Sequence, residues 1–197
     1  MVLAVLINFA VFGLTAGIYV SCFRDRDGNW SLNNGLRALR FFTLLSNLFC
    51  GLVSLLMGLA LLGSVPRWLW LLKYLATHTV TVTLLTVLVF LGPSLGYSEM
   101  FRGRDLYLHL IGPVLAVVSF CFLERIYPLS FSASLIGLIP VALYGLFYLY
   151  KVVLCPEGQR WEDFYGFNKT GKWPISFAAM LLGAFVICLL LRLLTRI

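Results

Sequence analysis

Long runs of apolar residues recur six times along the chain, separated by shorter polar segments. The runs lie near residues 2–22, 40–63, 68–91, 105–123, 131–151 and 174–195. Each contains roughly 20 residues, which is the length that an α-helix needs to cross the hydrocarbon core of a bilayer. The pattern therefore predicts an all-α, polytopic membrane protein in which residues 1–197 form a single bundle of six transmembrane helices.

Composition leaves little room for any other class. Hydrophobic residues make up 61% of the 197 residues, charged residues only 12%, and the mean hydropathy is +0.95. Soluble domains are far less apolar, and no segment outside the six runs is long enough to bury a core of its own. The net charge of +7 requires no nucleic acid as a partner, because attraction to anionic membrane lipids accounts for it.

Basic residues are distributed unequally between the two sets of loops. Most of them lie in or beside the loops at residues 23–39, 92–104 and 152–173: Arg24, Arg26, Arg37, Arg40, Arg102, Arg104, Lys151, Arg160, Lys169 and Lys172. The other side has only Arg67, Lys73, Arg125, Arg192 and Arg196. By the positive-inside rule, we predict that the three basic loops are cytoplasmic and that the termini lie outside. Gly92-Pro93 is expected to mark the end of the third span.

The acidic residues argue against one class of function. All eight lie in loops or at the ends of the predicted spans. Proton-coupled transporters commonly carry Asp or Glu inside the membrane, and many show inverted repeats, which are not evident here. We therefore disfavour a proton-driven carrier. With only two histidines and no carboxylate well inside a span, we also expect no metal site and no cofactor.

The second run has a polar face and a leucine face. At 100° per residue, a helix places on one side Arg40, Thr43, Ser46, Asn47, Cys50, Ser54 and Gly58, and on the other Leu44, Leu45, Leu48, Leu52, Leu55, Leu56 and Leu59. We predict that the polar face points into the bundle. Close helix packing alone would explain Ser46, Cys50 and Ser54. It explains Arg40 and Asn47 less well, because an unpartnered amide or guanidinium is costly in lipid.

The fourth run combines an ionisable residue with a helix breaker. It begins Asp105-Leu106-Tyr107-Leu108-His109 and continues to Gly112-Pro113. Asp105 and His109 share a helical face, so the carboxylate either orients the imidazole or caps the helix. Because Pro113 has no amide hydrogen, we expect the carbonyl of His109 to lose its helical partner and the helix to bend there.

Thr43 and His109 are the candidate catalytic residues. Each lies about one turn inside the membrane from the basic loops, and a threonine hydroxyl becomes a nucleophile when a nearby base accepts its proton. Asn47 is a candidate oxyanion donor, and Arg40 is a candidate ligand for a lipid carboxylate or phosphate. His78, near the middle of the third run, is predicted to make an interhelical hydrogen bond and is the reserve candidate for the base.

Arg40-Phe41-Phe42-Thr43, followed by His109 and then Pro113 four residues later, resembles a pattern of the androgen-induced and androgen-dependent membrane proteins, which hydrolyse fatty acid esters of hydroxy fatty acids. The resemblance covers most of the chain in span order and length and is strongest to a bacterial branch of six-helix proteins. It implies a threonine nucleophile at Thr43, a histidine base at His109 and a fatty-acyl ester as the substrate. It assigns no role to the other candidates.

Two other classes of function fit the same sequence. A small-molecule carrier or lipid-binding protein would use the polar face as a pathway or pocket, and a structural or regulatory bundle would leave no cavity at Thr43. The loop at residues 152–173 is rich in aromatic residues. It is interpreted either as a lid over the bundle or, more simply, as an interfacial anchor.

Overall fold

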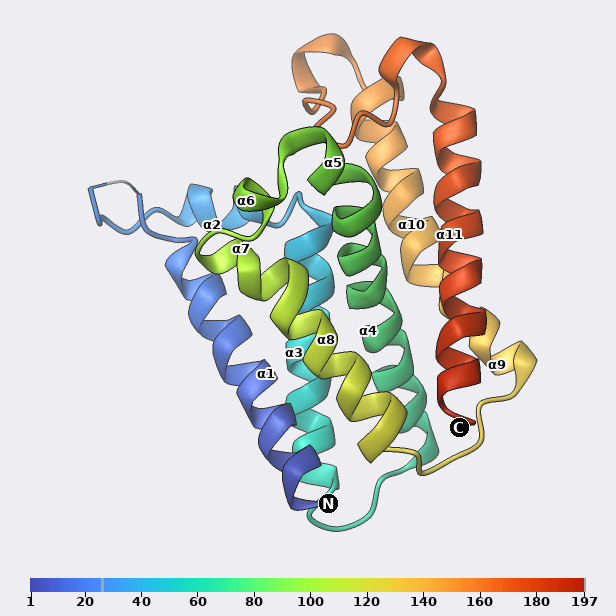
Figure 1. Ribbon diagram of the computed structural model, residues 1–197. Coiled ribbons are helices and arrows are strands. Elements are labelled where there is room, and N and C mark those ends of the chain that lie inside the picture. Colours follow the sequence, from blue (N-terminus) through green and yellow to red (C-terminus); the bar gives the residue numbers. More distant parts are fainter. Residues whose placement is uncertain (26, 197) are drawn as a thin grey trace.

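Six membrane-length helices form one bundle in the computed structural model of the protein, which describes residues 1–25 and 27–196 (Figure 1). The helices run over Val2–Ser21, Phe42–Ala60, Arg67–Leu95, Arg104–Leu123, Phe131–Leu154 and Trp173–Leu194. No strand is found among the described residues. The predicted all-α, multi-pass membrane architecture is confirmed. Arg26, one of the basic residues of the first loop, lies outside the described residues.

Two groups of helices make up the bundle. The first is a four-helix core that consists of α1 (Val2–Ser21), α3 (Phe42–Ala60), α4 (Arg67–Thr86) and α8 (Gly112–Val118). The second is a pair that packs on α4 and consists of α10 (Leu138–Leu149) and α11 (Trp173–Leu194) (Figure 1). Both termini lie at one end of the bundle, which we call the terminal end.

Short elements cover the opposite end, which we call the loop end (Figure 1). They are α2 (Leu32–Ala38), α5 (Gly92–Leu95), α6 (Tyr97–Met100), α7 (Arg104–Leu106), η5 (Glu157–Gln159) and η6 (Lys169–Gly171). The fifth span begins instead near the terminal end with the short helix α9 (Phe131–Leu135). The chain crosses from α9 to α10 at Gly137, which packs directly on Tyr74 and His78 of α4.

The polar face of α3 points into the bundle, as predicted. Asn47 is 2% exposed and Ser54 is fully buried, whereas Leu52 is 58% exposed and Leu56 is 44% exposed. One leucine departs from the prediction. Leu44 is buried because it packs against Tyr107 and Leu108, which cover that side of α3 near the loop end.

Two transmembrane helices contain a Gly-Pro pair, and each pair directly follows a wide π-helical turn. The turn η2 (Tyr107–Ile111) precedes Gly112-Pro113, and the turn η1 (Val87–Leu91) precedes Gly92-Pro93. In η2 the amide of Gly112 bonds the carbonyl of Tyr107, five residues earlier. In that register the next carbonyl, that of Leu108, would need the amide hydrogen that Pro113 lacks.

A side chain satisfies the orphaned carbonyl in both helices. The Asn47 amide donates to the carbonyl of Leu108 at 3.0 Å, and the Tyr97 hydroxyl donates to the carbonyl of Leu88 at 2.7 Å. Pro113 provides no amide for the carbonyl of His109 four residues earlier, as expected, and in the π register of η2 it also leaves the carbonyl of Leu108 without a backbone donor. The expectation that the third span ends at Gly92-Pro93 is wrong. The helix continues to Leu95, and the chain turns at Gly96, whose φ is 95°.

Glu124 corrects the view that every acidic residue stays outside the bundle. It follows η3 (Ser119–Leu123), and its amide closes that π turn on the carbonyl of Ser119 at 2.9 Å. The indole of Trp70 donates to the carbonyl of Glu124 at 2.8 Å. These bonds turn the Glu124 side chain inward, where it is fully buried with Lys73 and Asn8. Glu124 is thus a buried acidic residue of the kind that proton-driven carriers use, and such a carrier is no longer disfavoured on that ground.

Candidate functional site

Thr43 lies in the first turn of α3, at the loop end of the bundle, and is half-buried. Its carbonyl accepts hydrogen bonds from the Ser46 hydroxyl at 3.1 Å and from the Asn47 amide at 2.8 Å. The Ser46 hydroxyl also bonds the Thr83 hydroxyl of α4 at 2.9 Å. The polar side chains next to Thr43 therefore fix the first turn of α3 against α4 and η2.

Tyr165, which sequence reasoning did not single out, caps the helix that carries Thr43. The amide of Phe42 donates to the Tyr165 hydroxyl at 3.0 Å, while the N-cap residue Phe41 supplies no side-chain acceptor. The hydroxyls of Thr43 and Tyr144 lie beside the same oxygen. Burial raises the pKa of Tyr165, and hydrogen bonding to these neighbours partly offsets the rise.

The aromatic loop is anchored by Asp163. Its carboxylate accepts hydrogen bonds from the Tyr148 hydroxyl at 3.0 Å and from the amides of Phe167 and Asn168 at 2.8 Å each. Around this anchor, aromatic side chains pack into a cluster that includes Tyr148, Trp161, Phe164 and Phe167. The loop contacts the beginning of α3 through Tyr165 and Phe164, which fits both a lid and an interfacial anchor. The density of aromatic residues was the only feature of the sequence that pointed to it.

His109 lies in η2 and is 8% exposed. Its Nδ1 is 2.7 Å from the carbonyl oxygen of Met100. A carbonyl can only accept, so this contact places the hydrogen on Nδ1 and leaves Nε2 as the nitrogen with the free lone pair. No side chain or backbone group of the described residues bonds Nε2. The carbonyl of Met100, and not the carboxylate of Asp105, orients the ring.

Asn47 connects the two halves of the candidate site. Its two amide hydrogens go to the carbonyls of Thr43 and Leu108, and Leu108 directly precedes His109. This brace places Thr43 and His109 on adjoining elements at the same end of the bundle. Within the described chain, however, no hydrogen bond joins the Thr43 hydroxyl to the His109 ring. With both hydrogens in use, Asn47 has none left for an oxyanion in this arrangement.

Arg40 lies just outside α3 on the exposed surface of the loop end. Its guanidinium stacks over the Trp161 ring, 5.4 Å from the ring centroid, and its carbonyl accepts from the Tyr144 hydroxyl at 2.7 Å. The charged group therefore remains available to a ligand at the membrane surface, next to the loop that covers Thr43.

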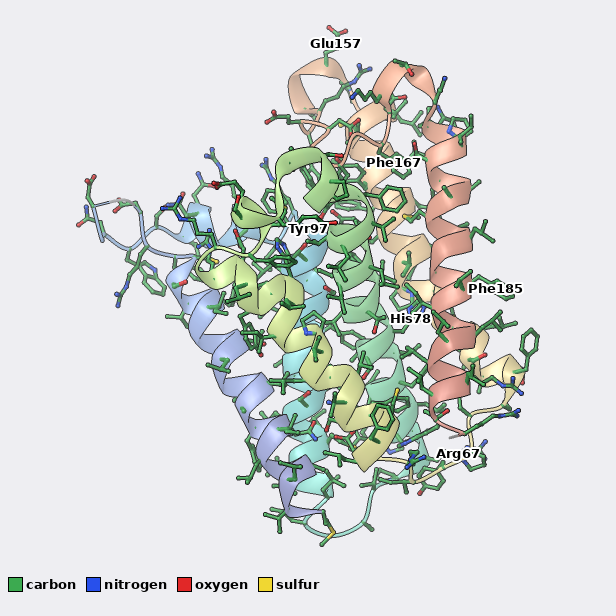
Figure 2. All side chains as sticks on the ribbon, viewed as in Figure 1. Arg67, His78, Tyr97, Glu157, Phe167 and Phe185 are labelled. Atoms are coloured by element: carbon green, nitrogen blue, oxygen red, sulfur yellow. The ribbon has the colours of Figure 1, made fainter. Side chains whose placement is uncertain are left out.

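His78 is fully buried in α4, and its Nε2 is 2.9 Å from the carbonyl oxygen of Ala184 in α11. Figure 2 shows the side chain between these two helices. The predicted interhelical hydrogen bond is confirmed. His78 lies on the side of α4 that faces α11, whereas Ser46, one turn from Thr43 on α3, bonds Thr83 on the side of α4 that faces α3.

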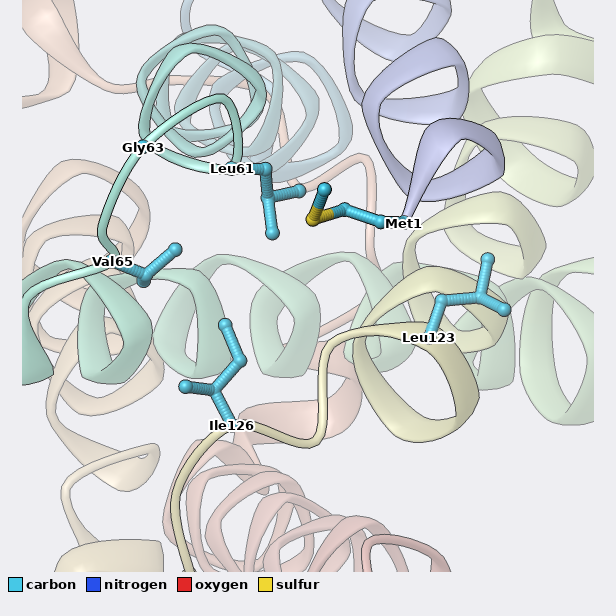
Figure 3. A pocket seen from close by; sticks show the side chains of 6 residues that line it. All are labelled: Met1, Leu61, Gly63, Val65, Leu123 and Ile126. Carbon is cyan, nitrogen blue, oxygen red and sulfur yellow. The ribbon is translucent and has the colours of Figure 1, made fainter.

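Two cavities lie away from Thr43 and His109. One, of about 330 Å³, opens at the terminal end and is lined by Met1, Leu61, Gly63, Val65, Leu123 and Ile126 (Figure 3). The other, of about 290 Å³, is an apolar groove between α1 and α3 lined by Phe12, Thr15, Ala16, Tyr19, Val20, Leu48, Gly51 and Leu52. Neither is lined by a candidate catalytic residue.

The fold and the site together define a six-helix integral membrane protein with a covered polar site at the loop end. Comparison with known proteins adds no family, since no protein-family model, no curated protein and no solved structure matches the chain.

Proposed function

We propose that the protein is an intramembrane lipid ester hydrolase, with Thr43 as the nucleophile, His109 as the general base and a fatty-acyl ester, such as a fatty acid ester of a hydroxy fatty acid, as the substrate. One observation carries the proposal. The bond from His109 Nδ1 to the carbonyl of Met100 at 2.7 Å leaves Nε2 as the acceptor nitrogen of the neutral ring, on an element that adjoins α3. The family resemblance of the sequence supports the same pair.

The proposed reaction has two steps. The Thr43 hydroxyl attacks the ester carbonyl carbon while its proton passes to His109 Nε2. The leaving alkoxide takes that proton, and an acyl-threonine remains. In the second step His109 accepts a proton from water, the resulting hydroxide attacks the acyl carbonyl, and the proton returns to Thr43 as the fatty acid leaves.

The oxyanion is proposed to bind at the beginning of α3. The amide of Phe42 already donates to an oxygen there, the hydroxyl of Tyr165. Amide groups in the first turn of a helix favour developing negative charge, so an oxyanion that replaces the Tyr165 oxygen would meet donors already in place. Opening of the aromatic loop would then expose both the donors and Thr43. Arg40, on the adjacent surface, is proposed to bind a carboxylate of the lipid.

The proposed orientation places this site in the cytoplasmic half of the membrane. The loops at residues 23–39, 92–104 and 152–173 all lie at the loop end (Figure 1), and the positive-inside rule assigns them to the cytoplasm, with the termini outside. Lys73, counted with the terminal end in the sequence, is buried within the bundle, so it adds no charge to that surface. A reporter enzyme that is active only outside the cytoplasm should therefore be active when it is fused to the C-terminus.

Hydrolysis by the purified full-length protein tests the proposal. We expect release of fatty acid from a fatty acid ester of a hydroxy fatty acid, and labelling by a long-chain probe that reacts with serine and threonine nucleophiles. Thr43→Ala and His109→Gln should each lower turnover at least ~100-fold, which is the lower end of what a general base contributes. Thr86→Ala changes another half-buried helical threonine and should leave turnover unchanged.

Full hydrolysis and labelling in Thr43→Ala would reject the enzyme and leave the two alternatives, a carrier or lipid-binding protein and a structural or regulatory bundle. These alternatives differ in one respect that the structure makes testable. A carrier needs a polar path through the bundle, whereas a structural bundle does not.

A further inference from the structure

A cluster of fully buried polar side chains occupies the four-helix core near the terminal end. Lys73 Nζ donates to Asn8 Oδ1 at 2.8 Å and to Ser54 Oγ at 2.7 Å. The Asn8 amide and the Ser119 hydroxyl both donate to Glu124 Oε1. All five side chains have 0% exposure. Asn8 thus connects the ammonium to the carboxylate, and four helices contribute to one network.

The cluster lies inside the membrane span. Asn8 is the seventh residue of α1, and Lys73 is the seventh residue of α4. At a rise of 1.5 Å per residue, each lies roughly 9 Å from the terminal end of its helix. Buried ionisable groups at such positions are costly in a membrane protein and commonly mark ion pathways or proton relays.

The hydrogen-bonding capacity of the cluster is not exhausted. Glu124 Oε2 is buried and has no hydrogen-bond partner among the described residues, although Oε1 of the same carboxylate accepts two hydrogen bonds. An ammonium has three hydrogens, and Lys73 uses two of them. A packed structural pair would be expected to satisfy these groups, since an unpaired buried polar atom is destabilising. Glu124 Oε2 and the third ammonium hydrogen of Lys73 can instead bond a small molecule that both donates and accepts hydrogen bonds, such as water.

Further polar side chains lead from this cluster toward the loop end. One helical turn beyond Lys73, Thr77 is fully buried, and within the described part of the chain its Oγ1 also has no hydrogen-bond partner. Beyond it, Ser46 and Thr83 share a hydrogen bond of 2.9 Å, and the Ser46 hydroxyl reaches the carbonyl of Thr43. Buried hydroxyls therefore occur on α4 at Thr77 and, closer to the loop end, between α3 and α4 at Ser46 and Thr83.

The cavity at the terminal end is lined in part by residues that are close to Glu124 in sequence. Leu123 and Ile126, which flank Glu124 and Arg125 in sequence, both line it (Figure 3). Besides Lys73, the titratable or charged groups around Glu124 are Cys50 on α3, Cys121 on η3 and Arg125. No second carboxylate takes part in the network formed by the described residues.

We propose that Lys73, Asn8 and Glu124 form the proton-binding site of a proton pathway, which runs from the cavity at the terminal end along α3 and α4 to the loop end. This inference goes beyond the proposed hydrolase and does not depend on it. A proton from water at the terminal end forms an O–H bond with Glu124 Oε2, and the site gains one positive charge. That O–H bond then breaks as the proton passes to a water molecule held at Thr77 Oγ1, and the carboxylate is restored.

Proton flux into vesicles that contain the full-length protein tests this proposal. Vesicles of phosphatidylcholine and phosphatidylglycerol carry a pH-sensitive dye inside, and a potassium gradient with valinomycin drives protons inward. We expect wild-type vesicles to acidify faster than protein-free vesicles. Glu124→Gln preserves the acceptor for Asn8 and Ser119 but cannot carry the proton, so it should reduce the protein-dependent rate at least ~10-fold.

Two further variants keep the test decisive. Thr77→Val has nearly the same shape and removes a hydroxyl oxygen that has no partner, so it should fold normally and still slow the flux. Glu99→Gln changes an exposed acidic residue of α6 and should leave the rate unchanged. The proposal is overturned if wild-type vesicles acidify no faster than protein-free ones. It is equally overturned if Thr77→Val, in a sample that elutes as wild type in detergent, conducts at the wild-type rate.

Discussion

The side-chain amide of Asn47 donates a hydrogen bond of 3.0 Å to the carbonyl of Leu108, the carbonyl that Pro113 leaves without a backbone donor. Asn47 lies on α3, so a side chain of one helix satisfies a backbone carbonyl that lacks a donor in another helix. Gly112 leaves room for the approach, since a Cβ there would lie 3.1 Å from Asn47 Oδ1, which is a tight contact. The same bond places α3, with Thr43, beside the turn that carries His109.

Replacing Asn47 should therefore destabilise the protein in a way that depends on Pro113. Asn47→Ala leaves the buried carbonyl of Leu108 unsatisfied and should lower the free energy of unfolding by about 1–3 kcal/mol. In a Pro113→Ala background the new amide can bond that carbonyl, and the same substitution should cost less. Denaturant unfolding of the four proteins in detergent gives the coupling. Equal losses in both backgrounds would show that the proline is not the reason for the bond.

The equivalent bond of Tyr97 to the carbonyl of Leu88 offers a matched comparison. Tyr97 is 45% exposed, so water can replace its hydroxyl when the residue is changed. Tyr97→Phe should lower the free energy of unfolding by no more than about 1 kcal/mol, less than Asn47→Ala. A larger loss than in Asn47→Ala would contradict the view that burial sets the cost.

Lys73 and Glu124 should be thermodynamically coupled. Lys73→Met leaves a buried carboxylate without its compensating cation and should lower the free energy of unfolding by about 3–5 kcal/mol. Adding Glu124→Gln removes that charge, so the double variant should be more stable than Lys73→Met alone. Thermal unfolding of both purified proteins in the same detergent measures the difference. Additive losses would mean that Asn8 separates the two charges too well for them to interact.

The two histidines should respond differently to the same substitution. His78→Gln retains a donor for the carbonyl of Ala184 and should keep most of the stability and ester hydrolysis. His78→Leu removes the donor and should cost about 1–3 kcal/mol of stability. His109→Gln should lose at least ~100-fold in hydrolysis while it stays folded. The reverse pattern in the activity assay would move the proposed base to α4.

Tyr165 should make the stability depend on alkaline pH. Its pKa is raised by burial above the ordinary value of 10.0, so the folded state holds the phenol proton more tightly than the unfolded state. The stabilisation is complete below about pH 10 and is lost as the pH rises through the higher pKa of the folded state. Relative to Tyr165→Phe, the wild type should lose stability above about pH 10. Unfolding measured at several alkaline pH values checks this, and parallel curves for the two proteins would contradict it.

The sequence by itself determined the fold class, the spans and the inward face of α3. These properties follow from the length of the apolar runs and from the angular distribution of apolar side chains around each helix. Each segment forms a helix by itself, because in lipid its backbone groups can bond only to one another. The interhelical role of His78 was predictable for the same reason: a buried imidazole in the middle of a span has to find a partner on another helix.

Only the tertiary structure decided which groups meet. The bonds of Asn47 to Leu108, of Tyr165 to the start of α3 and of Asn8 to Glu124 join residues 61, 123 and 116 positions apart. No local periodicity encodes such pairs. Glu124 shows the consequence most clearly, because its place at the end of an apolar run predicted exposure, whereas a π turn and the indole of Trp70 turn it into the bundle. A buried charge depends on partners that the fold brings together, and hydropathy along one helix does not contain that information.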